Sequence, residues 1–205
     1  MKKIAIINYG MGNLRSVENA VKNLNFDPKI ISTPKELNNY EKIILPGVGS
    51  FKKAMKLLKA NNWINSININ VKERKKYLFG ICLGMQLLAS ESEEFGITKG
   101  LELIKGKIKF LGNLGCKLKI PQIGWNSIFI KKKHKFLKGI TNNMDFYFVN
   151  SYAFVPEEKS FEIAKTNYDI DFCSIISKEN IFGAQFHPEK SSKAGRKILE
   201  NFLNA

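Results

Sequence analysis

The sequence predicts an α/β fold, a doubly wound and mostly parallel sheet flanked by helices, with additional antiparallel strands in the C-terminal half. Short apolar runs alternate with segments of helical periodicity four times within roughly the first 95 residues, the order of a parallel α/β sheet. The run at 77–81 shows no polar alternation, as is typical of a strand covered on both faces. After Gly100, strand-like runs follow one another between Gly, Asn and Pro turns, which favours antiparallel pairing.

The elements of the first half are predicted from the spacing of apolar residues and from the residues that typically begin or end helices and strands. Leu14, Val17 and Val21 have the spacing of a helix face. Thr33 and Pro34 supply a capping residue and a first-turn proline for another helix. The expected strands are 3–8, 29–31, 42–45 and 77–81, and the expected helices are 14–24 and three that start within 32–37, 54–58 and 85–89.

The second half is read as strands closed by one helix. We find no linker, internal repeat or low-complexity segment, so residues 1–205 are expected to form a single domain. The expected strands are 101–111, 120–130, 145–154, 161–166, 172–177 and a last one that ends before His187, and the closing amphipathic helix is 192–203.

The net charge of +15 arises from 33 basic and 18 acidic residues, and it suggests nucleic-acid binding at first sight. Only Arg15, Arg74 and Arg196 are arginines, the residue on which base reading and bidentate phosphate contacts depend most. The lysines are spread along the chain, so we interpret the charge as a solvated, lysine-rich surface. Such a face can also meet an acidic partner or attract an anionic substrate.

The cysteines and the apolar runs indicate the compartment. Cys82, Cys116 and Cys173 are widely spaced and form no CxxC pair, which excludes a disulfide framework and a zinc ribbon and suits a reduced cytosol. No uninterrupted apolar run approaches ~18 residues, so no segment is expected to span a membrane. The opening run at 1–8 is too short for a secretory leader, and we expect a cytoplasmic protein.

A candidate nucleophile lies where a buried strand meets a helix. Gly80 and Gly84 flank Cys82 at two residues' distance, the nucleophile-elbow pattern with sulfur in place of a hydroxyl. Glycines are needed at both places because side chains there would clash with neighbouring backbone. The helix that follows brings its positive end to the sulfur and favours the thiolate. The alternative is a small buried core cysteine, the role that we assign to Cys116 and Cys173.

A partner for this thiol is expected at His187, which follows a strand and precedes Pro188 and Glu189. Pro188 has no N–H to donate to a helix or to a neighbouring strand, so the segment is expected to be extended outside the sheet. Side chains two residues apart in an extended segment point to the same side. Glu189 would orient the imidazole toward the thiol, which makes a Cys–His–Glu triad. The alternative is a capping glutamate beside a surface histidine. His134, the other histidine, lies in a lysine cluster and is expected to be solvated.

Acyl transfer also requires hydrogen-bond donors for the oxyanion. Gly47 and Gly49 follow a strand and make the turn flexible enough to aim the Val48 N–H into the site. The N–H of Leu83, directly after the nucleophile, is the second expected donor. A plain glycine turn is the alternative for this segment.

Two segments, 80–86 and 186–191, resemble the most specific motifs of the class I (triad) glutamine amidotransferases. Four others resemble the HisH-type branch of that family, the glutaminase subunits of imidazole glycerol phosphate synthase. The resemblance covers essentially the whole chain in order. The four segments are 9–13, 46–51, 123–126 and 146–149.

The resemblance implies that glutamine is hydrolysed through a thioester at Cys82 and that the ammonia passes to a HisF-type (β/α)₈-barrel synthase in a heterodimer. There, a phosphorylated ribulosyl substrate yields imidazole glycerol phosphate and an aminoimidazole carboxamide ribonucleotide (AICAR) in histidine biosynthesis. No metal or organic cofactor is implied. The resemblance places Gly49, Gln86, Glu94, Ser151 and Tyr152 around the glutamine, and Asn13, Trp125, Tyr147 and Lys190 on the face that meets the barrel.

The chain departs from the family pattern at Asn8, where Asp is usual, and at Gln122 and Asn150, where His is usual. The departures leave the acceptor of the ammonia open. The alternative is a HisH-like paralogue that supplies a HisF-like partner making acetamidino groups on surface sugars.

Two interpretations from other classes also stay open on the residues alone. An α/β hydrolase or peptidase would share the cysteine elbow, but Gln86 and the His-Pro-Glu order argue against it. A basic flavodoxin-like adaptor would tolerate changes at Cys82 and bind nucleic acid in a salt-sensitive way.

Overall fold

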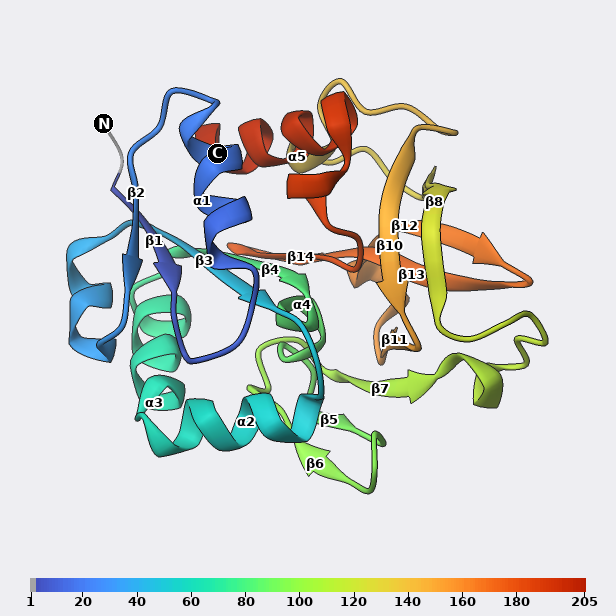
Figure 1. Cartoon of the computed structure of the whole chain (residues 1–205), viewed down its shortest axis with the longest axis horizontal. Helices are drawn as coiled ribbons and strands as arrows, with labels where there is room; N and C mark the ends of the chain where they lie inside the picture. The colour runs from blue at the N-terminus through green and yellow to red at the C-terminus, as the bar shows by residue number, and fades with distance from the viewer. Residues whose placement is uncertain (1–2) are drawn as a thin grey trace.

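The fold is built on a twelve-stranded sheet, seen in Figure 1 in a computed structural model that describes residues 3–205. Residues 1 and 2 of the short opening run lie outside the described part. Five neighbouring strands, in the order β2-β1-β3-β4-β14, all run parallel. Their bounds are β1 Ile4–Ile7, β2 Pro28–Ile31, β3 Lys42–Gly47, β4 Tyr77–Cys82 and β14 Ile181–Ala184.

Helices cover both faces of this parallel part. Every residue of β1 and β3 is buried, because α1 and α5 pack on one face and α2 and α3 on the other (Figure 1). The prediction of a doubly wound, mostly parallel sheet is therefore confirmed. The helices are α1 Leu14–Lys22, α2 Phe51–Ala60, α3 Trp63–Asn68, α4 Leu83–Gln86 and α5 Ser192–Asn204.

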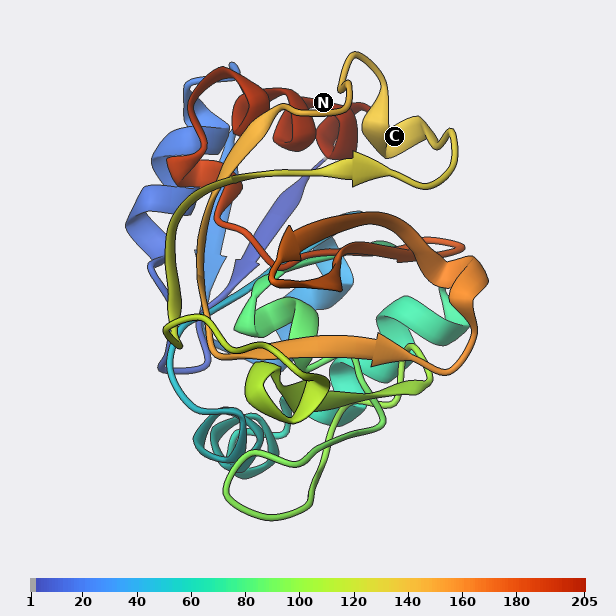
Figure 2. The ribbon, with the colours of Figure 1, turned by 90° about the vertical axis from the view of Figure 1, so that its right-hand side faces the viewer.

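The C-terminal half continues the sheet beyond β14 with mostly antiparallel pairs, and β8 and β10 form a separate two-stranded ribbon. In Figure 2 this ribbon runs down one side of the molecule, and β11 leaves it at a corner to join the main sheet. The strands are β5 Glu91–Ser92, β6 Thr98–Lys99, β7 Gly106–Phe110, β8 Gln122–Ser127, β9 Phe129–Ile130, β10 Asp145–Asn150, β11 Tyr152–Pro156, β12 Glu162–Tyr168 and β13 Ile170–Lys178.

Two predicted elements around the elbow are shorter than expected, for one shared reason. The helix expected to start within 85–89 begins at Leu83 and already ends at Gln86, and the strand expected at 101–111 starts only at Gly106. The N–H groups of residues 101–104 donate to the carbonyls of residues 87–89, so the first segment cannot continue as a helix and the second cannot join a ladder.

Two predicted strands are each divided. The strand at 120–130 breaks at Ile128, whose N–H donates to the Met144 carbonyl. The strand at 145–154 breaks at Ser151, where the chain passes from the ribbon to the main sheet and the Ser151 carbonyl accepts from the Leu111 N–H. The second break places Ser151 at a corner beside Cys82's pocket.

The helix predictions need smaller corrections. The segment after Thr33 forms only a 3₁₀ helix, Pro34–Asn39. The helix expected to start within 54–58 begins at Phe51, because the Ser50 hydroxyl accepts from the Lys53 N–H and caps it. No helix within residues 3–205 is long and apolar enough to cross a membrane.

Candidate active site

The turn from β4 into α4 holds Cys82 in a strained conformation. Its φ is 54° and its ψ is −113°, values that a side-chain-bearing residue rarely adopts. A Cβ on Gly80 would lie 2.5 Å from the Gly84 carbonyl oxygen, and one on Gly84 would lie 1.8 Å from the Leu45 carbonyl oxygen. The expected steric reason for both glycines is confirmed, and the elbow exists because β3, β4 and α4 approach this closely.

Replacing Gly84 with alanine is expected to lower the free energy of unfolding by ~3 kcal/mol or more, because backbone on both sides must move. Denaturant titration of the two proteins measures the change. Gly112→Ala is the matched control, since the three atoms nearest to a Cβ there all belong to the Phe110 side chain rather than to backbone. A Gly84→Ala protein as stable as the original would contradict this prediction, because it would show that a Cβ fits between α4 and the Leu45 carbonyl.

His187 and Glu189 form a buried pair. The distance from His187 Nδ1 to Glu189 Oε1 is 2.8 Å, and the side chains are 5% and 1% exposed. The pair does not arise from an extended segment, as the sequence suggested: Pro188–Lys190 is one turn of 3₁₀ helix, with Pro188 at its first position. The tight turn, rather than strand alternation, brings the carboxylate back to the imidazole.

The charge of His187 is set by opposing effects. Burial lowers the pKa of the imidazole, but the hydrogen bonds and charges of Cys82 and Glu189 outweigh burial and raise this pKa to about 10. The imidazolium form is therefore favoured at neutral pH. Because Nδ1 faces Glu189, Nε2 is the nitrogen left for Cys82.

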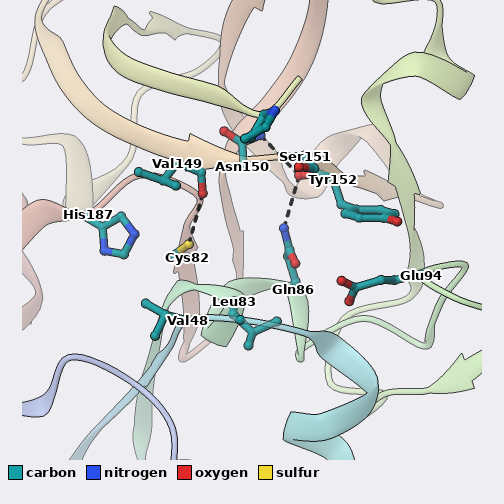
Figure 3. A pocket seen from close by; sticks show the side chains of 12 residues that line it. Val48, Cys82, Leu83, Gln86, Glu94, Val149, Asn150, Ser151, Tyr152 and His187 are labelled. Carbon is teal, nitrogen blue, oxygen red and sulfur yellow. Dashed lines mark hydrogen bonds between the residues drawn. The ribbon is translucent and has the colours of Figure 1, made fainter. Parts of the chain in front are cut away.

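A cavity of about 270 Å³ opens over Cys82 and His187 (Figure 3). All nine residues that the sequence proposed for nucleophile, base, oxyanion donors and glutamine binding line it, and only Glu189 stands outside, behind His187. Their roles remain predictions, but the fold brings the residues together. The lining residues are Val48, Gly49, Cys82, Leu83, Gln86, Glu94, Pro121, Val149, Asn150, Ser151, Tyr152 and His187.

Glu94 is tied to the neighbouring turn. Its Oε2 accepts from the N–H of Phe51, the first residue of α2, over 2.6 Å. A carboxylate at a helix N-terminus is favoured there by the dipole. Glu94 thereby fixes the far end of the turn that carries Val48 and Gly49. Burial and then the charge of Glu94 raise the pKa of Tyr152 across the pocket.

Gln185 is a site residue that the sequence reading missed. It is fully buried; its amide nitrogen donates to Cys82 Sγ over 3.8 Å, and its oxygen accepts from the Gln86 amide over 3.0 Å. The available signal was a polar residue two positions before His187, in an otherwise apolar run. Gln86 also donates to the Tyr152 carbonyl, which leaves the Gln86 oxygen as its remaining group for a ligand (Figure 3).

The positions that depart from the family pattern lie at different places. Asn150 lines the cavity, and Gln122 is its register partner on β8. Both amide oxygens are buried and, within residues 3–205, have no hydrogen-bond partner. Asn8 bonds locally, to Ser32 and to the Gly10 N–H.

The predicted docking residues form a cluster with one outlier. The rings of Trp125 and Tyr147 lie 6.1 Å apart, and Lys190 Nζ lies 5.7 Å from the Tyr147 ring centre. Trp125 is 54% exposed and the adjacent Ile123 is 65% exposed. Asn13 instead caps α1, where its side chain accepts from the Ser16 N–H.

The remaining singled-out residues lie away from the cavity. His134 is half-buried against Ser177 and Phe136 rather than solvated, so that expectation was wrong. Cys116 and Cys173 are buried, and each thiol donates a hydrogen bond to a backbone carbonyl. Burial raises the pKa of the Cys173 thiol well above its usual value. Over residues 3–205, no cluster of three or more His, Cys, Asp or Glu side chains could hold a metal ion.

Comparisons with known proteins point to one family. The family model for glutamine amidotransferase class-I matches residues 5–205. The chain is 51% identical to "Imidazole glycerol phosphate synthase subunit HisH" of Caldanaerobacter subterraneus subsp. tengcongensis, with 97% of this chain and 96% of that one covered. It is 46% identical to "Imidazole glycerol phosphate synthase subunit HisH 2" of Methanococcus maripaludis, with 98% of each covered.

Solved structures show the same fold at low identity. "Structure of PurLQS from Thermotoga maritima" matches with a TM-score of 0.79 at 19% identity, covering 100% of this chain and 99% of that one. "Crystal structure of glutamine amidotransferase" matches with a TM-score of 0.77 at 18% identity, covering 98% and 97%. The family model and the close relatives set aside the peptidase and adaptor interpretations: the chain belongs to the class-I glutamine amidotransferase family.

Proposed function

We propose that the chain hydrolyses glutamine to glutamate and ammonia with Cys82, His187 and Glu189 as a catalytic triad. The observation that carries the proposal is the geometry at the elbow. The strained Cys82 lines the same small pocket as His187, and His187 Nδ1 lies 2.8 Å from Glu189 Oε1. The reaction class is acyl transfer to a thiol.

The mechanism follows from these groups. The Cys82 thiolate attacks the carboxamide carbon of glutamine, and the His187 imidazolium gives its Nε2 proton to the leaving nitrogen, so ammonia departs and a thioester remains. Water, deprotonated by the now neutral His187, attacks the thioester; the C–S bond breaks, glutamate leaves, and the Cys82 thiolate and the His187 imidazolium are both restored. The N–H groups of Val48 and Leu83 stabilise the oxyanion in both steps.

Substrate recognition is assigned to the opposite end of the pocket. Glu94 and the free oxygen of Gln86 supply acceptors suited to the α-ammonium group. Gly49, Ser151 and Tyr152 line the rest and would contact the backbone portion of the amino acid.

We further propose that the ammonia is delivered to a HisF-type barrel synthase, which makes imidazole glycerol phosphate and AICAR. The relatives' names, which are those of synthase subunits, support the existence of a partner subunit, and the Trp125–Tyr147–Lys190 cluster is the surface that would contact it. The backbone carbonyl of Tyr147 also accepts a hydrogen bond from the backbone N–H of His187. A partner that contacts Tyr147 would therefore touch a residue bonded directly to the triad histidine. A reduced thiol nucleophile suits the cytoplasm.

Complementation tests the acceptor. Expressed with a conventional HisF in a bacterial strain lacking its own HisH, this chain is expected to restore growth without histidine. Failure by a stable chain that hydrolyses glutamine would favour the paralogue that serves acetamidino-sugar synthesis, the alternative raised by Gln122 and Asn150.

A further inference from the structure

The hydroxyl of Tyr9 is a buried donor without a partner. Tyr9 is 1% exposed, and within residues 3–205 its Oη makes no hydrogen bond. Buried phenols usually find a partner, because an unpaired polar group in the interior costs free energy. Trp63 Nε1 on α3 is also unpaired, but no Trp63 atom is among the three nearest to the point where a Cβ on Gly47 would lie, whereas Tyr9 Oη is. The position of Tyr9 is what distinguishes it.

Tyr9 lies directly against the turn that carries the proposed oxyanion donor. Its Oη is 2.7 Å from the point where a Cβ on Gly47 would lie, and Leu83 Cβ and Gly84 N are each 3.0 Å from that point. The phenol and the elbow therefore meet at the same side of Gly47, which is in register with Cys82. Tyr9 is absent from the pocket lining, so the phenol meets Gly47 from outside the pocket. Burial, and then the charge of Cys82, raise the pKa of Tyr9, which therefore keeps its proton.

The turn is fixed at both ends and free between them. Gly47 is paired in β3, and Glu94 holds the Phe51 N–H at the start of α2. Between these anchors, Val48 is 42% exposed and Gly49 has a φ of 98°. Within residues 3–205 no backbone hydrogen bond of a turn, loop or cap holds Val48 or Gly49, which leaves the N–H side of the Gly47–Val48 peptide free to turn.

Rotation of one peptide unit moves two groups in opposite directions. The Val48 N–H and the Gly47 C=O belong to the same trans peptide, and they point opposite ways. When the Val48 N–H turns toward a glutamine carbonyl in the pocket, the Gly47 C=O turns out of the pocket, where it needs a new donor.

We propose that the Tyr9 hydroxyl is a positioning group for this turn, unpaired in the resting arrangement and donating to the Gly47 carbonyl when the Val48 N–H enters the oxyanion site. The proposal rests on the proposed glutaminase function. A hydrogen bond made only in the active arrangement raises kcat rather than substrate affinity, and it favours the active turn once the partner has docked.

Tyr9→Phe tests this, assayed alone and with the HisF-type synthase and its phosphorylated ribulosyl substrate. The stimulation factor, kcat with partner divided by kcat without, is expected to fall about tenfold, the rate equivalent of one hydrogen bond. KM for glutamine should stay within about twofold. The Tm of the isolated chain should be unchanged or higher, since an unpaired hydroxyl is removed. Tyr40→Phe, the same change at a ring packed on the same core cluster, should leave the stimulation factor as it is.

A Tyr9→Phe chain with normal stimulation overturns the proposal. So does an equal loss with and without partner, or a Tm several degrees lower or a failure to fold, since these would mean that the hydroxyl is already bonded in the resting chain. If the unmodified chain hydrolyses no glutamine, or is not stimulated, the proposed function itself fails, and that outcome is distinct.

Discussion

Replacing Cys82 with alanine is expected to lower glutamine hydrolysis by roughly 10⁴-fold or more, since no other group at the elbow can form the acyl intermediate. Synthesis from free ammonia by the complex should persist, because ammonia bypasses the thioester. Steady-state glutamate release and ammonia-dependent product formation measure the two activities on one preparation.

Cys116→Ala is the matched control for this change. Cys116 is buried and bonded to the Tyr168 carbonyl, away from the cavity, so its loss should leave glutamine hydrolysis near the original rate. Glutamine hydrolysis retained by the folded Cys82→Ala chain would remove Cys82 from the reaction.

Replacing His187 with alanine is expected to lower kcat at least ~10²-fold, the usual contribution of a general acid–base. The imidazole delivers the proton to ammonia and later takes one from water, so both half-reactions slow. Glu189→Gln should cost less, because the amide keeps a hydrogen bond to Nδ1 and loses only the charge that helps to raise the pKa of His187. Initial rates at saturating glutamine check the order.

His134→Ala serves as the control, since His134 packs on Ser177 and Phe136 and does not line the cavity. Its rate should match the original. Equal rates for a folded His187→Ala chain would show that another group moves the protons.

The elbow was predictable because its cause is local. Glycines on either side of Cys82 carry the steric requirement in the sequence itself, and the structure adds only the atoms that would clash. The parallel half was predictable for a similar reason, since each buried strand is a short apolar run between turn residues.

The divided strands and Gln185 were not predictable, because their causes are contacts between distant segments. No residue near Ser151 indicates that its carbonyl accepts a hydrogen bond from the N–H of Leu111, forty residues earlier in the sequence, at the point where the predicted strand breaks. Gln185 reads as an isolated polar residue until the fold places Cys82 and Gln86 on either side of it. His187 and Glu189 were paired correctly but by the wrong geometry, because a 3₁₀ turn at Pro188–Lys190 that follows an extended His187, and not an extended segment throughout, makes the contact.

Mass spectrometry of the acylated chain tests the proposed chemistry most directly. The protein, with its synthase partner, is mixed with glutamine, quenched in acid within the first turnover and digested. The thioester mechanism predicts that the peptide containing Cys82 gains one glutamyl group, and that the Cys82→Ala chain gains none. Glutamate released with no adduct at Cys82, or an adduct on Cys116 or Cys173 instead, would contradict the mechanism.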